Sequence, residues 1–241
     1  MSGASKAQPE PEGKPAQGEA PPQRRRPAPL VDGSEQVLEL VAAAPRPRPV
    51  AGAWRSLFDG AAPAELADRL FQGDPLGLWP RCAALVADRR FVVHLDRVYA
   101  AAVARTALLA SLYRGRPAIE GWLDARIHDA LRGLLATDAA AEMERRPTDP
   151  ADHWLHAMMA EVFGVPPPLA RRAAVVFNAR PRAHRRVLFA LTFEGCSVAE
   201  SVALGLGTKA EIEAQLAAGL AALSRLDPPT LKDLLALEGE L

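Results

Sequence analysis

Residues 181–226 read PRAHRRVLFALTFEGCSVAESVALGLGTKAEIEAQLAAGLAALSRL and contain the strongest local signals for secondary structure in this chain. Ser197 and Glu200 have the spacing of a capping box, in which a hydroxyl and a carboxylate each accept a hydrogen bond from the other residue's backbone N–H at a helix start. Thr208 and Glu211 repeat this spacing, directly after a Gly-Leu-Gly turn. A short helix, a glycine-containing turn and a longer helix are typical of a helix-turn-helix, and an ordinary helical hairpin fits the same spacing.

Apolar residues on both sides of this turn recur at helical spacing. Pro181 suits a helix start, and the apolar stripe that follows it ends at Gly195. The second helix is expected to turn four residues inward: Ile212, Leu216, Leu220 and Leu223. It is expected to turn six residues outward: Lys209, Glu211, Glu213, Gln215, Ala217 and Ala218. The pattern predicts two packed helices, the second with one face exposed.

The composition of the whole chain favours an all-α fold. Only 13 of its 241 residues are aromatic, and the β-branched residues that strands also prefer are scarce. The 29 basic and 29 acidic side chains cancel, so net charge gives no argument for nucleic-acid binding. No apolar run reaches the ~18 residues of a membrane span, and the polar N-terminus lacks a signal-peptide core, which predicts a cytoplasmic protein without membrane contact.

We expect two small helical domains between two tails. Residues 1–50 hold ten of the 22 prolines and few large apolar side chains, so they are expected to be disordered. From Ala64 on, apolar residues recur every three or four positions, which predicts helices over about 91–113, 119–135 and 151–163. The expected division is a disordered tail at 1–50, a helical domain at 54–136, a linker with a short helix at 137–168, a helix-turn-helix domain at 169–226 and a helical tail at 227–241.

Residues 180–226 resemble, without a gap, the fourth conserved region of bacterial sigma factors of the extracytoplasmic-function type. The resemblance is carried by Pro181, Arg185, Val187, Leu188, Glu194, Gly195, Ser197, Glu200, Thr208, Ile212, Leu216 and Leu220. Upstream, AELADRLFQGDPLGLW at 64–79 is similar to the family's opening helix and its Gly-Asp-Pro turn, and EGWL at 120–123 is similar to the start of its promoter-melting segment. The order and spacing resemble the short, two-domain sigma factors over 64–136 and 169–226.

This resemblance implies a transcription-initiation protein that binds RNA polymerase core and promoter DNA, with an anti-sigma factor as a further candidate partner. The second helix of the helix-turn-helix, the recognition helix, would contact DNA at Thr208, Lys209, Glu211 and Gln215. The promoter-melting candidates are Trp122, Arg126 and His128. A tryptophan at this position can stack on an unpaired base or belong to the helical core, and the sequence leaves both open.

The family's polymerase-binding helix carries acidic and amide residues that contact the polymerase clamp. The aligned residues in this chain are Ala102, Arg105 and Thr106, which are neither acidic nor amide. The resemblance therefore identifies the helix but not the contacts that it would make.

A group of arginines lies just before the helix-turn-helix, and no acidic residue occurs between 165 and 186. Cationic side chains there could neutralise DNA phosphates without reading the sequence, or form a solvated helix face. The backbone-contact candidates are Arg180, Arg182, Arg185 and Arg186, and Arg171 and Arg172 extend the group. Glu213, by contrast, places a carboxylate on the recognition helix. The alternative function is therefore a sigma-like helical interaction module that has lost promoter recognition and acts through protein binding.

Enzymatic chemistry is not expected, and neither is a cofactor, a metal or a small-molecule substrate. The chain contains no dinucleotide-binding glycine motif, phosphate-binding loop or nucleophile elbow. Cys82 and Cys196 stand far apart, so the sequence has neither a disulfide framework nor a cysteine metal motif. His153 and His156 share a helix face but lack a third ligand at a recognisable distance.

Overall fold

The structure is a computed structural model that describes residues 53–148 and 153–226. These residues belong to one compact unit, and they are helical throughout, with turns but no strand in the described ranges. The expected all-α class is confirmed for this part of the chain. The expected disordered tail at 1–50 and the helical tail at 227–241 lie outside the described residues.

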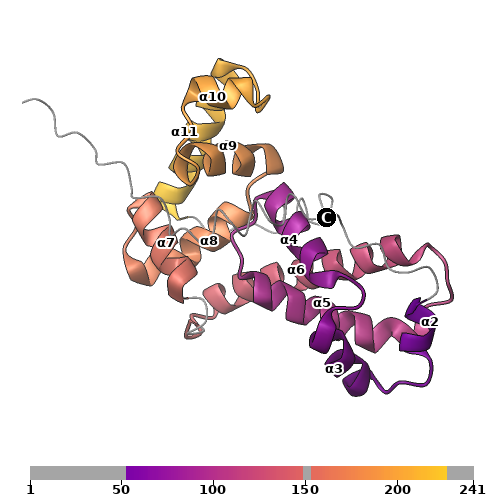
Figure 1. Cartoon of the computed structure of the whole chain (residues 1–241). Helices are drawn as coiled ribbons and strands as arrows, with labels where there is room; N and C mark the ends of the chain where they lie inside the picture. The colour runs from indigo at the N-terminus through magenta and orange to yellow at the C-terminus, as the bar shows by residue number, and fades with distance from the viewer. Residues whose placement is uncertain (1–52, 149–152, 227–241) are drawn as a thin grey trace, which may run out of the picture. The chain divides into compact units, whose positions relative to one another are not determined.

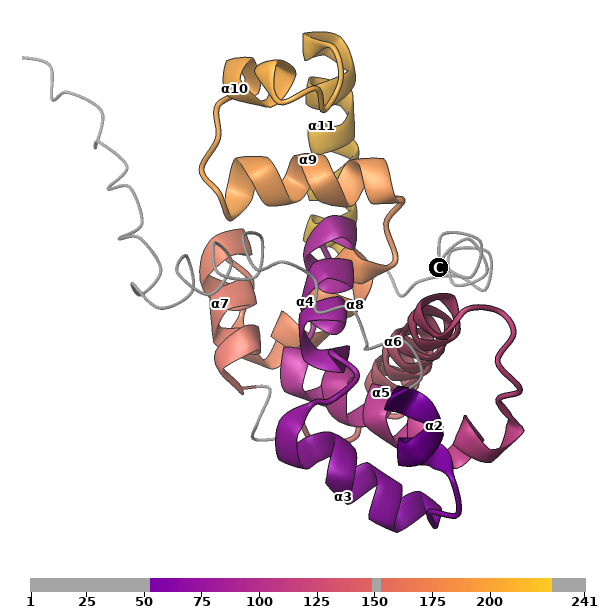
Figure 2. The same cartoon turned by 45° about the vertical axis from the view of Figure 1, so that its right-hand side comes forward.

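The first group of helices, called here the first lobe, packs around its own apolar core (Figures 1 and 2). Its elements are α2 (Ala53–Phe58), α3 (Pro63–Gly73), α4 (Leu78–Arg89), α5 (Leu95–Leu109), the 3-10 turn η1 (Ala110–Leu112) and α6 (Ile119–Met143). α5 lies beside α6 and also contacts α3 and α4, so it forms the centre of the lobe. Its inward side chains, such as Val98 and Val103, are fully buried in the same core as Leu123 and Ile127 of α6.

The Gly-Asp-Pro turn at 73–75 connects α3 to α4, and its aspartate caps the start of α4. The Asp74 carboxylate accepts hydrogen bonds from the backbone N–H groups of Leu78 (2.7 Å) and Trp79 (2.9 Å). These are N–H groups of the first turn of α4, which have no partner within the helix itself. Asp74 and Gly77 adopt left-handed backbone angles, with φ of 43° and 62°, which reverse the chain between α3 and α4.

Two expected helix limits in this lobe are wrong. The helix expected from residue 91 begins at Leu95, because Phe91, Val92 and Val93 form a buried connection before it. The helix expected to end near residue 135 continues to Met143, so the polar residues from 137 on, expected to begin a linker, are helical at first.

The second lobe contains the helix-turn-helix and the helices that support it. Its elements are α7 (His153–Phe163), the 3-10 turn η3 (Pro167–Leu169), α8 (Ala170–Asn178), α9 (Arg182–Thr192), α10 (Val198–Ala203) and α11 (Lys209–Arg225). Phe177, Leu188 and Leu223 are buried at its core, and the rings of Phe163 and Phe193 pack beside them. Val92, from the connection between α4 and α5, is also part of this core.

α9 and α11 approach each other closely at Gly219. A Cβ atom at Gly219 would lie 2.5 Å from Leu188 Cδ1, so any larger residue would displace the buried Leu188 side chain. Of the residues expected to face inward, Ile212 and Leu223 are buried and Leu216 is half-buried. Leu220 is 43% exposed, which contradicts the expectation. Eight residues of α-helix turn Leu220 roughly 80° away from Ile212, so it leaves the buried face.

Candidate nucleic-acid interface

The two expected capping boxes are confirmed, and they set the starts of α10 and α11. Ser197 N–H donates to Glu200 Oε2 (2.7 Å) and Glu200 N–H donates to Ser197 Oγ (3.2 Å) at the start of α10. At the start of α11, Thr208 N–H donates to Glu211 Oε2 (2.8 Å), and the Thr208 hydroxyl donates to the same oxygen. These bonds lower the pKa of the Glu211 carboxyl. Thr208 and Glu211 therefore form the cap of α11, the helix expected to contact DNA, and the Glu211 carboxylate is engaged in that cap.

The exposed face of the recognition helix carries few groups that could read DNA. Lys209 is exposed, and its Nζ lies 3.8 Å from Glu213 Oε1. Gln215, expected to face outward, is half-buried, and its side-chain oxygen is buried without a hydrogen-bond partner. The remaining exposed surface of α11 is mainly alanine: Ala210, Ala214, Ala217, Ala218 and Ala221.

Arg185 is the one backbone-contact candidate that the described structure buries completely. Its guanidinium donates to the carbonyl oxygens of Arg89 (3.1 Å), Asn178 (3.2 Å) and Arg180. The same group lies 4.0 Å from the centre of the Phe91 ring. In this arrangement the group joins α9 to the end of α4, and a DNA phosphate cannot reach it.

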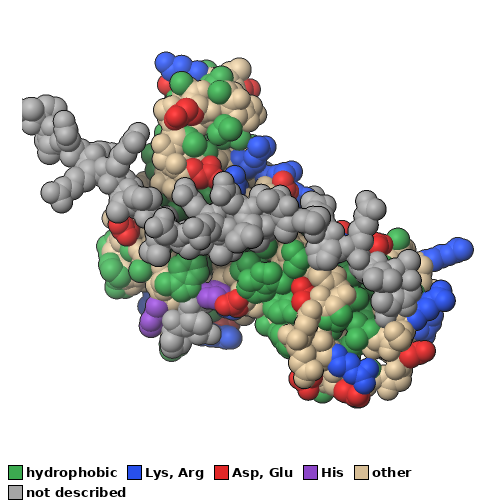
Figure 3. Space-filling view, viewed as in Figure 1, with side chains coloured by type: hydrophobic (Ala, Val, Ile, Leu, Met, Phe, Trp, Pro, Cys, Tyr) green, Lys and Arg blue, Asp and Glu red, His purple; other side chains and the backbone are tan. Residues whose placement is uncertain are grey.

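The other three backbone-contact candidates lie around the first turn of α9. Figure 3 shows basic side chains, in blue, gathered in this region beside the end of α4. Arg186 is exposed, and Arg180 and Arg182 are partly exposed. Arg182 Nη2 donates to both carboxylate oxygens of Asp88 in α4, at 2.7 and 2.8 Å. These candidates are thus brought together, but an acidic residue of the first lobe lies among them.

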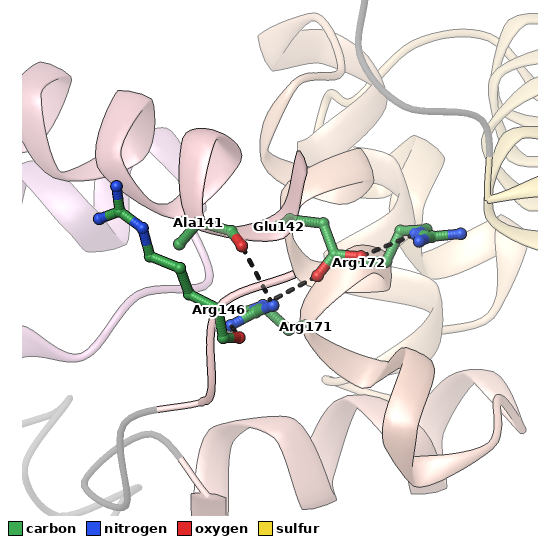
Figure 4. A network of polar contacts seen from close by, with 5 residues as sticks. All are labelled: Ala141, Glu142, Arg146, Arg171 and Arg172. Carbon is green, nitrogen blue, oxygen red and sulfur yellow. Dashed lines mark hydrogen bonds and ion pairs between the residues drawn. The ribbon is translucent and has the colours of Figure 1, made fainter. Parts of the chain in front are cut away.

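Arg171 and Arg172 form a polar network that joins the two lobes (Figure 4). Each donates from its Nε to one carboxylate oxygen of Glu142, at 2.8 Å. Arg171 also donates to the carbonyl oxygens of Arg146 (2.6 Å) and Ala141 (3.3 Å). The network anchors the last turn of α6 to α8, which explains why α6 continues to Met143.

The network also shifts the ionisation of Glu142. Partial burial by itself would raise the carboxyl pKa, but the hydrogen bonds and charges of Arg171 and Arg172 outweigh it, and the pKa is lowered. A carboxylate with a lowered pKa in the folded state stabilises the fold above the ordinary carboxyl pKa. That contribution is lost as the pH falls through the lowered value.

We expect Glu142→Gln to lower the free energy of unfolding by about 1–3 kcal/mol at neutral pH, since it leaves two partly buried guanidinium groups without their carboxylate. The difference from wild type should shrink below the ordinary carboxyl pKa of about 4.3. Urea unfolding of both proteins at neutral and acidic pH measures it. Glu144→Gln is the matched control, because Glu144 is exposed and pairs with the nearby Arg146. Equal losses for the two variants would contradict a stabilising role of the Glu142 network.

The promoter-melting candidates lie together on α6. Trp122 is in the core of the first lobe, and Arg126 and His128 contact nearby residues of the same helix. Trp122 is 8% exposed, and its ring centre lies 4.9 Å from that of Tyr113 and 5.8 Å from that of Phe58. The Arg126 guanidinium lies over the Trp122 ring and pairs with Asp129 at 2.9 Å. His128 Nδ1 lies 2.6 Å from the Asp124 carbonyl oxygen. Of the two alternatives for Trp122, the structure places it in the core.

The positions aligned with the family's polymerase contacts also lie mostly inward. Ala102 and Thr106 are fully buried, and Arg105 lies across α6 at Gly133. Two large leucines are instead exposed at the end of α5 and in η1: Leu108 (63% exposed) and Leu112 (65% exposed).

Sequence reasoning missed Asn178, which links the two lobes. Its side-chain oxygen accepts from Val92 N–H (2.8 Å), and its amide nitrogen donates to Val92 O (2.9 Å). Asn178 is 6% exposed and follows the apolar run of residues 173–177 at the end of α8. A lone amide at the end of an apolar run is the only signal in the sequence that could have identified it.

Within the described ranges, no three His, Cys, Asp or Glu side chains are grouped so that they could hold a metal ion. No helix there is long and apolar enough to cross a membrane. Comparison with models of known protein families gave no match, and comparisons with curated proteins and with solved structures gave none either.

Proposed function

We propose that this chain is a sigma-factor-like transcription protein that binds RNA polymerase core and promoter DNA. The observation that carries the proposal is the pair of adjacent capping boxes, which set α10 and α11 as a helix-turn-helix. This unit follows an α-helical lobe in the same chain, in the order that the sequence resemblance implies. α11 would enter the major groove with its N-terminal end, where Thr208 and Lys209 are exposed.

The contacts to the DNA backbone would come from the first turn of α9. Arg180 precedes the helix, while Arg182 and Arg186 lie within it; all three are at least partly exposed, and each could neutralise one phosphate. Arg185 is omitted because it is buried. Polymerase core would contact Leu108 at the end of α5 and Leu112 in η1.

A second candidate function is a sigma-like interaction module that binds protein through the helix-turn-helix. Val202, Leu204 and Leu220 are each more than 40% exposed on α10, the turn and α11. Glu213 adds a carboxylate on the same helix as the exposed alanines. An apolar and acidic surface favours a protein partner over a phosphate backbone.

Two substitutions on the exposed face of α11 distinguish these functions. Glu213→Lys with Ala217→Arg adds positive charge one helical turn apart, without changing a buried residue. If α11 lies in a major groove, duplex affinity should rise at low salt, and the slope of log affinity against log salt should steepen by ~1–2 units.

The matched control is Ala64→Arg with Asp68→Lys, which makes the same charge change at the same spacing on the exposed face of α3. Fluorescence anisotropy with one labelled duplex gives both salt slopes. If the α11 and control variants have the same slope, α11 is not a DNA contact. Retention of polymerase core in a pull-down by the wild-type chain would then separate an interaction module from a protein with neither activity.

A further inference from the structure

Two acidic residues form ion pairs with arginines where α4 meets α9. Arg182, in the first turn of α9, donates from Nη2 to both oxygens of Asp88, near the end of α4. On the other side of the junction, Arg90 Nη2 lies 3.0 Å from Glu194 Oε1. Asp88 and Arg182 are 94 positions apart in sequence, so only the folded arrangement brings them together.

The surroundings of these pairs are strongly cationic. Three arginines pair with two carboxylates there: Arg89 and Arg182 with Asp88, and Arg90 with Glu194. Arg180 and Arg186 precede and follow Arg182 in the sequence. The Asp88 side chain is 57% exposed and that of Arg182 is 38% exposed, so solvent and other anions can reach the pair. An exposed ion pair contributes little to stability, and its carboxylate can be exchanged for another oxyanion at low cost. Carboxylate and phosphate oxygens are alternative acceptors for the same guanidinium group.

Asp88 is nevertheless held beside α9 by buried contacts. Arg185 of α9 donates to the carbonyl oxygen of Arg89, the residue after Asp88. Asn178 of α8 binds both backbone groups of Val92 a few residues later. These contacts fix the backbone around Asp88, so the carboxylate stays within reach of Arg182.

We propose that the α4–α9 junction is an autoinhibitory contact, in which Asp88 occupies the place of a nucleic-acid phosphate on Arg182. The carboxylate competes with the phosphate for the guanidinium and repels the phosphates beside it. This inference rests on the proposed function, since the competing ligand is the backbone of the DNA that α9 and α11 would bind. The inference adds that the chain itself supplies a competitor, the Asp88 carboxylate, for the phosphate-binding position on Arg182.

Asp88→Asn tests the contact. The variant keeps the shape of the side chain, removes its charge and leaves the buried frame unchanged. Affinity for a duplex at about 50 mM salt should rise about three- to tenfold, as expected for one charge removed close to a phosphate. Asp68→Asn is the matched control, because Asp68 is exposed on α3 and the substitution changes the net charge equally. The control variant should gain less than twofold.

The same measurement in an Arg182→Gln background identifies the mechanism. If Asp88 acts by occupying Arg182, most of the gain from Asp88→Asn should disappear when Arg182 is absent. Equal affinities of Asp88→Asn and Asp68→Asn, in a wild-type chain that binds DNA, would overturn the autoinhibitory contact and leave the proposed function standing. Absence of binding by both the wild type and Asp88→Asn would overturn the proposed function and this inference with it.

Discussion

Arg185→Met should lower the free energy of unfolding by about 3–5 kcal/mol, the largest loss expected from a single polar side chain in this protein. Methionine fills a similar volume but donates no hydrogen bond. The carbonyl oxygens of Arg89, Asn178 and Arg180 would lose the guanidinium that they share. Each buried carbonyl left without a donor costs about 1–3 kcal/mol, and the contact with the Phe91 ring is lost as well.

Arg186→Met provides the matched control for this prediction. Arg186 is the next residue in α9 but is exposed, so its replacement should change stability by no more than about 0.5 kcal/mol. Urea unfolding followed by circular dichroism gives both values. Similar small losses for the two variants would show that the buried contacts of Arg185 do not hold α9 to α4.

Trp122→Ala should cost about 3–5 kcal/mol of stability, as is typical for a large aromatic side chain removed from a core. Its ring packs against Phe58 and Tyr113 and is covered on one side by Arg126. The substitution would leave a cavity between α2 and α6. α2 has only six residues, so it is too short to fill this cavity by shifting. Thermal melting of the variant measures the loss.

Trp154→Ala is the control for Trp122→Ala, because Trp154 on α7 is 56% exposed and should lose far less. An unaltered melting temperature for Trp122→Ala, together with reduced open-complex formation on promoter DNA, would contradict the core assignment. That result would place Trp122 in contact with unpaired bases instead.

The features that the sequence predicted correctly depend on neighbours within a few residues. The two capping boxes join residues three positions apart, so the starts of α10 and α11 could be located from the pattern alone. The all-α class followed from composition, because few residues in the chain favour strands. In both cases the information is local.

The features that the sequence did not predict depend on partners far along the chain. Arg185 reads as one of several surface arginines, and its burial depends on Phe91 and on the carbonyl group of Arg89. The extension of α6 depends on Arg171 and Arg172, about 30 positions after Glu142. The exposure of Leu220 has a simpler origin, because spacings of four drift around a helix with 3.6 residues per turn.

The Asn178–Val92 pair also allows the separation of the two lobes to be measured by hydrogen exchange at one backbone amide, that of Val92. Val92 belongs to a connection between helices, where amide protons ordinarily exchange quickly with solvent. Its N–H, however, is bound by a buried side chain of the other lobe. The proton can therefore exchange only when α8 leaves the connection, so its exchange rate reports how often the two halves of the molecule come apart.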